Sequence, residues 1–247
     1  MPMSPRLLRP RAAGGFNPKS LSGLTLWLDA ADASAVTLDG NSRVSQWSDK
    51  SGLGRHFTQT NAAVRARYNA TVNGKNAINS IFSESGGNAA LTRPGVTNAD
   101  FGGATSATVF VVFNLESTIE FFNTSSLGDA ASNLDRFNAD SRTYSSRLRG
   151  ARAAGILMGM PTIGTVIFGT VANSATATQT WRRQGAQVGS AADSYSGWLS
   201  ATNQTWSFLS GTSASNIRHC EAVFYNRALN ATELAAIESY LLRKWAP

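Results

Sequence analysis

The chain has 247 residues, of which 42% are hydrophobic and only 15% are charged, so it can fill the core of one large β-sandwich, and wholesale disorder is excluded. No run of about 18 apolar residues occurs, so a membrane-spanning helix is not expected. The formal net charge is +7, but residues 1–20 contain four basic residues and no acidic one, so the remainder is only mildly basic. Cys220 is the single cysteine, which excludes an intramolecular disulfide and suits assembly in a reducing cytoplasm.

Residues 1–20 are predicted to form an extended, basic, proline-rich arm. Four prolines exclude a long helix, and Leu7-Leu8 is far too short for the apolar part of a signal peptide. Such a segment has too little apolar surface to become ordered by itself. We therefore expect another subunit to hold it, with a disordered tail or an arm held by its own domain as the alternatives. The arm residues expected to contact that subunit are Arg6, Leu7, Leu8, Arg9, Arg11 and Phe16.

From Leu21 onwards, short apolar stretches alternate with turn-rich ones, which is typical of a β-sandwich rather than of βαβ units. Residues 24–28 alternate with a period of two, which predicts a strand. Residues 107–113 are apolar and mostly β-branched or aromatic, which predicts a central strand buried on both faces, with residues 118–122 as its pairing partner. Further strands are expected at residues 44–47, 143–148, 164–171, 178–183, 204–209 and 218–225.

One helix is predicted, at residues 231–244. Asn230 followed by Glu233 forms a capping-box pattern, and Leu234, Ile237 and Leu241 then recur at helical spacing. Arg243 and Lys244 in the last turn complement the helix dipole. Residues 151–160 are compatible with a helical turn or a loop.

Two parts of the chain carry a recognisable pattern. The first is Leu26-Trp-Leu-Asp-Ala-Ala-Asp-Ala-Ser34, followed by Val44-Ser-Gln-Trp-Ser-Asp-Lys-Ser-Gly-Leu-Gly-Arg-His56. The second is Glu221-Ala-Val-Phe-Tyr-Asn-Arg-Ala-Leu-Asn230 together with the ending Tyr240-Leu-Leu-Arg-Lys-Trp245. Together they resemble the concanavalin A-like, laminin-G-like jelly-roll domains of tailed-bacteriophage structural proteins and of bacterial surface and carbohydrate-active proteins. The resemblance implies an all-β fold: a two-sheet antiparallel jelly-roll sandwich over residues 21–247, which includes the short C-terminal helix and follows the extended arm.

Within this pattern, Trp27 and Trp47 are expected to be core anchors rather than sugar platforms. Residues 49–54 are expected to form a tight turn that needs small residues. Asn226 and Arg227 should hold the corner that leads into the final helix.

No catalytic signature is present, and we expect no enzyme activity. Hydrolases of this broad fold use paired carboxylates on one strand, whereas the expected strands 107–113, 164–171 and 178–183 contain no Asp or Glu. His56 and His219 are expected to be structural. No cofactor or metal is expected. The alternative is a calcium ion bound by Asp29 and Asp32 or by Asp135 and Asp140, although capping of a turn is the favoured role for Asp29 and Asp32.

Basic residues also cluster outside the arm, at Trp181-Arg182-Arg183 and at Arg142, Arg147, Arg149 and Arg152. These clusters suit phosphate, an anionic polysaccharide or an acidic neighbouring subunit. We favour the neighbouring subunit, and direct binding to nucleic acid is not expected.

Two functions follow from these observations. The first is a non-enzymatic phage virion protein, a capsid decoration, head fibre or tail component, assembled in the cytoplasm of the bacterial host. Its arm would grip other virion proteins while an oligomeric jelly roll faces outward from the virion surface. The alternative is a carbohydrate-binding adhesin that stacks sugars on exposed loop aromatics: Trp181, Tyr195, Trp198 and Trp206. Exposure of these aromatics would favour sugar binding, and burial would favour a structural role.

Overall fold

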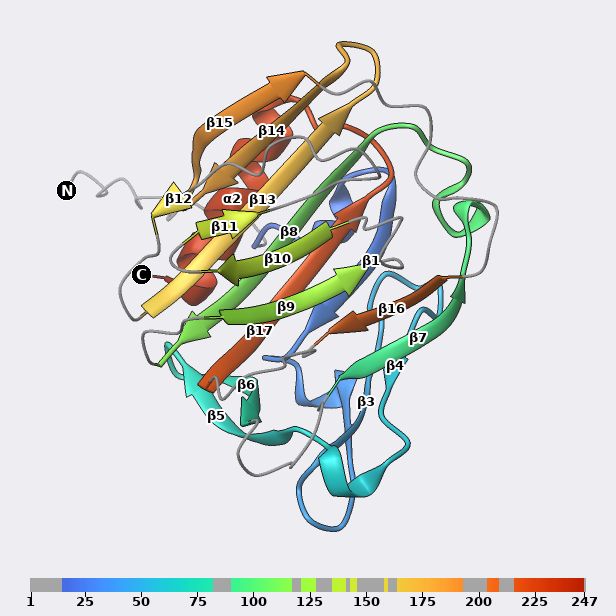
Figure 1. Cartoon of the computed structure of the whole chain (residues 1–247), viewed down its shortest axis with the longest axis vertical. Coiled ribbons are helices and arrows are strands. Elements are labelled where there is room, and N and C mark those ends of the chain that lie inside the picture. The colour runs from blue at the N-terminus through green and yellow to red at the C-terminus, as the bar shows by residue number, and fades with distance from the viewer. Residues whose placement is uncertain are drawn as a thin grey trace, which may run out of the picture.

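In the computed structural model, the described residues form two antiparallel β-sheets and an α-helix, arranged in three layers (Figure 1). The structure describes residues 15–81, 90–116, 121–127, 135–140, 143–145, 158–159, 164–192, 204–208 and 216–246. Side chains of residues 121–145 and 158–159 are not described. Expectations for arm residues 1–14, for Tyr195 and Trp198, and for the side chains of Arg142, Arg147, Arg149 and Arg152 therefore lie outside the described part.

The first sheet has the order β15-β14-β13-β8-β17-β6-β5, and β1 also pairs with β17. Its strands are β1 (Leu24–Asp29), β5 (Arg67–Val72), β6 (Lys75–Ile81), β8 (Ala107–Leu115), β13 (Gly164–Asn173), β14 (Thr178–Arg183), β15 (Ala186–Ala192) and β17 (Asn216–Tyr225). The apolar strand β8 lies at the centre and is buried along most of its length, as its composition predicted. One edge of β17 pairs with β8, and its other edge is shared by β6 and β1.

The second sheet has the order β12-β11-β10-β9-β16-β7-β4-β3-β2. Its strands are β2 (Val36–Leu38), β3 (Val44–Trp47), β4 (Phe57–Thr58), β7 (Leu91–Val96), β9 (Phe121–Leu127), β10 (Asp135–Asp140), β11 (Thr143–Ser145), β12 (Met158–Gly159) and β16 (Gln204–Phe208). The prediction that the segment after β8 pairs with β8 was wrong, because β9 pairs with β10 and β16 in this second sheet. The neighbours of β8 are β13 and β17.

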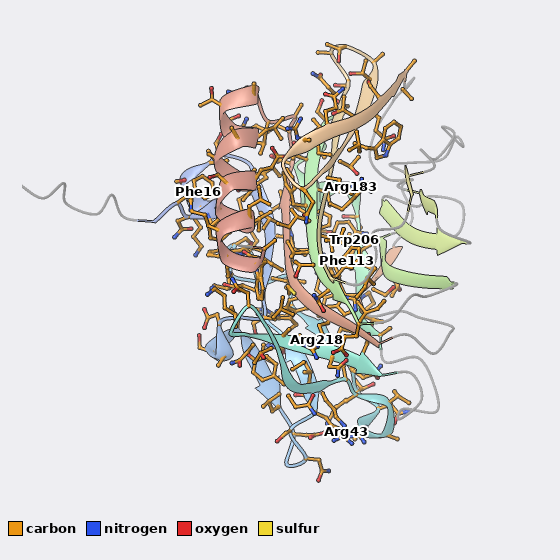
Figure 2. The ribbon with its side chains drawn as sticks, turned by 90° about the vertical axis from the view of Figure 1, so that its left-hand side faces the viewer. Phe16, Arg43, Phe113, Arg183, Trp206 and Arg218 are labelled. Atoms are coloured by element: carbon orange, nitrogen blue, oxygen red, sulfur yellow. The ribbon has the colours of Figure 1, made fainter. Side chains whose placement is uncertain are left out.

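Two hydrophobic clusters hold the layers together. The larger fills the space between the sheets and includes Trp47, Phe113, Trp206 and Phe224, and Figure 2 shows Phe113 and Trp206 between the two sheets. The smaller lies between the first sheet and the helix and includes Trp27, Ile237 and Trp245. The first sheet is therefore buried on both faces, which explains why its central strands read as continuous apolar runs.

A β-bulge at Cys220 decides which side chains of β17 face the helix. His219 pairs with Phe113, and Glu221 pairs with Val112, so Cys220 is an extra residue on its strand. In a regular strand, His219 and Glu221 would point to the same face. The extra residue places Glu221 on the helix side, where it meets residues of the helix.

The helix α2 (Ala231–Trp245) confirms the predicted element and is one residue longer. Asn230 and Glu233 form the predicted capping box, and Arg227 makes a two-pronged ion pair with Glu233 at 2.6 and 2.8 Å. Short 3₁₀ turns occur at Pro18–Ser20, Ala33–Ala35, Ala62–Val64 and Asn98–Phe101. Within the described residues, no helix has the length and apolar character needed to cross a membrane.

Candidate functional site

A buried carboxylate, Glu221, lies at the centre of a polar cluster between β17 and α2. One oxygen accepts hydrogen bonds from the indole of Trp27 (2.7 Å) and the hydroxyl of Tyr240 (2.8 Å). The other accepts from Lys244 Nζ (2.8 Å) and the indole of Trp245 (2.7 Å). Burial raises the pKa of Glu221, the charge of Asp29 adds to this, and Lys244 opposes it. Because four donors fill the acceptor positions of the carboxylate, Glu221 ties α2 to the sheet and has no position left for a substrate.

Two lysines extend this cluster to the surface. Lys244 Nζ lies 2.7 Å from Asp29 Oδ1, and Lys50 Nζ lies 2.9 Å from Asp29 Oδ2 and 2.7 Å from Asp32 Oδ2. The hydrogen bond from Lys50 lowers the pKa of Asp32 to about 2. The alternative of a calcium ion at Asp29 and Asp32 is therefore not supported, because lysine ammonium groups neutralise both carboxylates. Asp32 also caps the turn at Ala33–Ala35, as favoured from the sequence.

The turn after β3 is held by Asp49, which is buried. Its carboxylate accepts hydrogen bonds from the backbone N–H of Trp27 (3.0 Å), Ser51 (2.8 Å) and Arg55 (3.1 Å). His56 Nδ1 accepts from the backbone N–H of Asp49 at 3.0 Å, which confirms a structural role for this histidine. The Asp49 carboxylate thus fixes this turn to β1 through backbone hydrogen bonds.

The aromatic residues proposed as sugar platforms do not form one in the described structure. Trp181 and Trp206 are 0% and 1% exposed and belong to the core between the sheets. The prediction for these two was wrong because both lie on strands, on the face that points into the sandwich, and not on loops. Trp27 and Trp47 are core residues, as expected.

Phe16, the last residue of the predicted arm contact set, packs on its own domain. Its ring lies 5.6 Å from the ring of Tyr240 in α2, and Figure 2 shows it beside the helix. The carbonyl of Pro18 also accepts a hydrogen bond from the Tyr225 hydroxyl at 3.0 Å. The last residues of the predicted arm therefore pack on the sandwich.

His219 and Cys220 are both buried, on opposite faces of β17, as expected for strand neighbours. His219 Nε2 lies 3.3 Å from Ser80 Oγ, and burial lowers the pKa of His219 to about 3. Burial raises the pKa of the Cys220 thiol well above its usual value. Neither side chain is placed to act as a nucleophile or a base on a solute.

A shallow, polar pocket of about 470 Å³ opens beside the C-terminal end of α2. It is formed by the ends of β5, β8, β13 and β17 together with the end of the helix. Its lining residues are Thr71, Val72, Asn73, Asn114, Thr165, Arg218, Trp245 and Ala246. We call this the Arg218 pocket, and Figure 2 shows Arg218 on the sheet below the helix. It is a candidate binding site because six of its eight lining side chains carry hydrogen-bonding groups.

The polar groups of the Arg218 pocket are held in place by the sheet. Arg218 Nη1 donates to the Thr71 carbonyl at 2.6 Å, and its Nη2 donates to the Glu116 carboxylate. Asn114 Nδ2 donates to Thr165 Oγ1 at 3.1 Å. Asn73 occupies the left-handed region with φ 48° in a two-residue Asn-Gly turn between β5 and β6, and its Nδ2 donates to the Lys244 carbonyl at 3.1 Å. The sequence offered only the Asn-Gly turn as a signal, because the other residues come from strands far apart in the chain.

A second groove, of about 510 Å³, runs between α2 and the β14–β15 hairpin. Across it, Arg182 makes a two-pronged ion pair with Glu238 at 2.5 and 2.9 Å. The acidic partner of Arg182, one residue of the predicted basic patch, is therefore Glu238 in the chain's own helix. Arg182 fixes the hairpin to α2, and its charge is neutralised.

The acidic side chains that the structure describes are all used within the fold. Each forms an ion pair or accepts backbone hydrogen bonds. Among the described residues, no group of three or more His, Cys, Asp or Glu side chains could hold a metal ion. Chemically, the Arg218 pocket offers hydrogen bonds to a polar ligand.

The architecture is that of an all-β, two-sheet antiparallel sandwich of the concanavalin A-like, jelly-roll type with one C-terminal helix, as the sequence predicted. No family model matches the chain, and no curated protein matches it.

Solved structures similar to the chain include a Trypanosoma rangeli sialidase in complex with 2,3-difluoro-KDN (TM-score 0.61, 14% identity). They also include the binding domain of Paraclostridial Mosquitocidal Protein 1 (TM-score 0.61, 12% identity) and the binding domain of Botulinum Neurotoxin DC in complex with SialylT (TM-score 0.59, 8% identity). Each match covers 91% of the present chain, which spans 33% of the sialidase chain and 53% and 52% of the two toxin chains. At these identities the likeness establishes the fold alone.

Proposed function

We propose that the protein is a non-catalytic carbohydrate-binding module. The observation that carries the proposal is the shared sandwich fold with toxin binding domains, one of which was solved in complex with SialylT. The Arg218 pocket supplies a place for a saccharide, because sugar hydroxyls both donate and accept hydrogen bonds. Amide, hydroxyl and guanidinium groups match them in that pocket.

The pocket also sets the expected strength of binding. It is shallow, and Trp245, its aromatic lining residue, is 0% exposed, so ring stacking on an open aromatic face contributes little there. Binding through a few hydrogen bonds to neutral groups is weak for one copy, and repetition on an oligomer would raise the avidity.

A glycan array probed with the full chain in a multivalent, labelled form tests the proposal. We expect binding to a restricted set of saccharides, competed by the same saccharides free in solution. Absence of any bound saccharide on the array and in titration calorimetry at millimolar sugar would refute the carbohydrate-binding function.

We also propose, as a second candidate, that the module belongs to a phage virion and is anchored by its N-terminal arm. The support is the family pattern in the sequence and the arm's basic, proline-rich composition. In addition, Phe16 packs on α2, so the described chain begins on the helix side of the first sheet, away from the second sheet (Figure 2). An arm that leaves from this face could grip other virion subunits while the second sheet points outward.

The anchoring proposal is tested by comparing the full chain with a variant lacking residues 1–14, which keeps Phe16 and its packing. Capsids or virions stripped of the protein are the target. We expect the deletion to abolish attachment while the melting temperature stays unchanged. Equal attachment of both forms, or of neither, would refute an anchoring arm.

A further inference from the structure

We infer that the Arg218 pocket takes an uncharged saccharide and excludes one that carries a carboxylate. This inference rests on the carbohydrate-binding function proposed above and specifies its ligand class. It goes beyond the solved structures named above, one of which is a complex with 2,3-difluoro-KDN and another a complex with SialylT.

The first argument is the occupancy of the guanidinium. An arginine recognises a carboxylate best through two parallel N–H donors. In this pocket each terminal nitrogen of Arg218 already donates one of its two N–H groups, Nη1 to the Thr71 carbonyl at 2.6 Å and Nη2 to Glu116. Its Nε is buried and has no hydrogen-bond partner among the described residues. Because Nε is buried, the Nε–Nη2 edge is closed to a ligand, and a carboxylate at the remaining N–H groups of Nη1 and Nη2 would lie beside the Glu116 carboxylate, which repels it.

The second argument is charge. Among the described residues that line the pocket, Arg218 alone has an ionisable side chain, and Glu116 neutralises it. Trp245 and Ala246, which also line the pocket, are the last residue and the C-cap of α2. The C-terminal end of a helix carries partial negative charge. A ligand carboxylate would therefore meet a neutralised arginine and a negative helix end, whereas a hydroxyl can donate to that end.

The third argument is the supply of paired donors and acceptors. The bonds of Asn73 to Lys244 and of Asn114 to Thr165 use amide N–H groups. Within the described part of the chain, they leave the amide oxygens of both asparagines and the hydroxyl proton of Thr165 for a ligand. Vicinal sugar hydroxyls match this alternation of acceptors and donors.

The test uses titration calorimetry and the array with two probe sets: neutral oligosaccharides of hexoses and N-acetylhexosamines, and the same oligosaccharides capped with sialic acid. We expect the full chain to bind neutral members and to lose affinity when the cap is added. Binding of a neutral ligand should change less than twofold between about 50 mM and 500 mM salt, because salt screens charge interactions and not hydrogen bonds.

Variants assign the binding to the pocket. Asn114→Ala and Asn73→Gly should each weaken binding of the neutral probe by about tenfold, the loss expected for one hydrogen bond. Glycine is chosen at position 73 because it keeps the positive φ. The matched control Asn41→Ala, at an exposed position in the loop between β2 and β3, should not change affinity.

Glu116→Gln provides the opposite change. It removes the charge that neutralises Arg218, so affinity for the sialylated probes should rise severalfold. Preferential binding of sialylated probes by the unmodified chain would overturn the inference and leave the carbohydrate-binding function standing. Neutral binding that survives both asparagine variants would overturn the assignment to this pocket, and a chain that binds neither probe set would refute the function itself.

Discussion

The cluster around Glu221 gives a sharp test of what fixes the helix to the sheet. Glu221→Gln keeps the shape of the side chain but replaces an acceptor oxygen with an NH₂ group. The four groups that contact the carboxylate are all donors, at 2.7–2.8 Å. In either amide orientation, the new N–H group therefore faces two donors, and Lys244 loses one of its two carboxylate partners.

The size of the effect follows from these contacts. Breaking a buried ion pair costs about 3–5 kcal/mol, and each buried donor left without an acceptor costs about 1–3 kcal/mol. Lys244 keeps Asp29 at 2.7 Å, so the lower end applies. We expect the free energy of unfolding to fall by about 3 kcal/mol, which lowers the melting temperature by roughly 6–12 °C in a chain of this size.

Urea unfolding followed by tryptophan fluorescence is the assay, since Trp27 and Trp245 both donate to Glu221. The matched control is Glu116→Gln, which breaks the ion pair with the 29%-exposed side chain of Arg218 and should cost less than about 1 kcal/mol. A loss for Glu221→Gln no larger than that of the control would refute the reasoning.

Three further predictions concern other parts of the fold. Burial lowers the pKa of His219 to about 3 in the folded protein. As the pH falls, this histidine is therefore protonated in the unfolded state before it is protonated in the folded state. Its contribution to stability is full above about pH 6.5 and is lost as the pH falls, by about 1.4 kcal/mol per pH unit. The free energy of unfolding should thus decline more steeply between about pH 6 and pH 4 for the natural chain than for His219→Gln, and parallel slopes would contradict this. Gly169→Ala would place a methyl group against the ring of Phe110 and should cost about 1–3 kcal/mol in urea unfolding. In the control Gly40→Ala, the added methyl group meets nothing within 4 Å, so the free energy of unfolding should change by less than about 0.5 kcal/mol. Equal urea midpoints for the two variants would contradict the close packing of Gly169 on Phe110. Trp181→Ala should lower stability by about 3–5 kcal/mol because the ring is buried between the sheets, and a melting temperature within 2–3 °C of the natural chain would contradict a core position.

The elements that depend on neighbouring residues could be predicted from the sequence. The capping box of Asn230 and Glu233 and the apolar spacing of Ile237 and Leu241 act within one or two helical turns, so the position of α2 was predicted to within one residue. The buried strand β8 was also predicted, because its unbroken apolar run suits only the centre of a sheet covered on both faces. The structural roles of Trp27, Trp47 and His56 could also be predicted, because the strands and the turn that hold them are encoded by neighbouring residues.

Side-chain direction and strand partners were decided only by the tertiary structure. The side of the sheet to which Trp181 and Trp206 point depends on the register of their strands, and the sequence does not state that register. β9 joins the second sheet because its partners, β10 and β16, meet it only in the fold.

The sequence by itself determined the all-β class, the C-terminal helix and the turn chemistry, because these depend on composition and on contacts a few residues apart. The position of Glu221 depends on a one-residue bulge, and the Arg218 pocket combines side chains from β5, β8, β13 and β17. Only the tertiary structure decided these features, because the residues that meet are separated by up to 194 positions along the chain in the Glu221 cluster and 171 in the pocket.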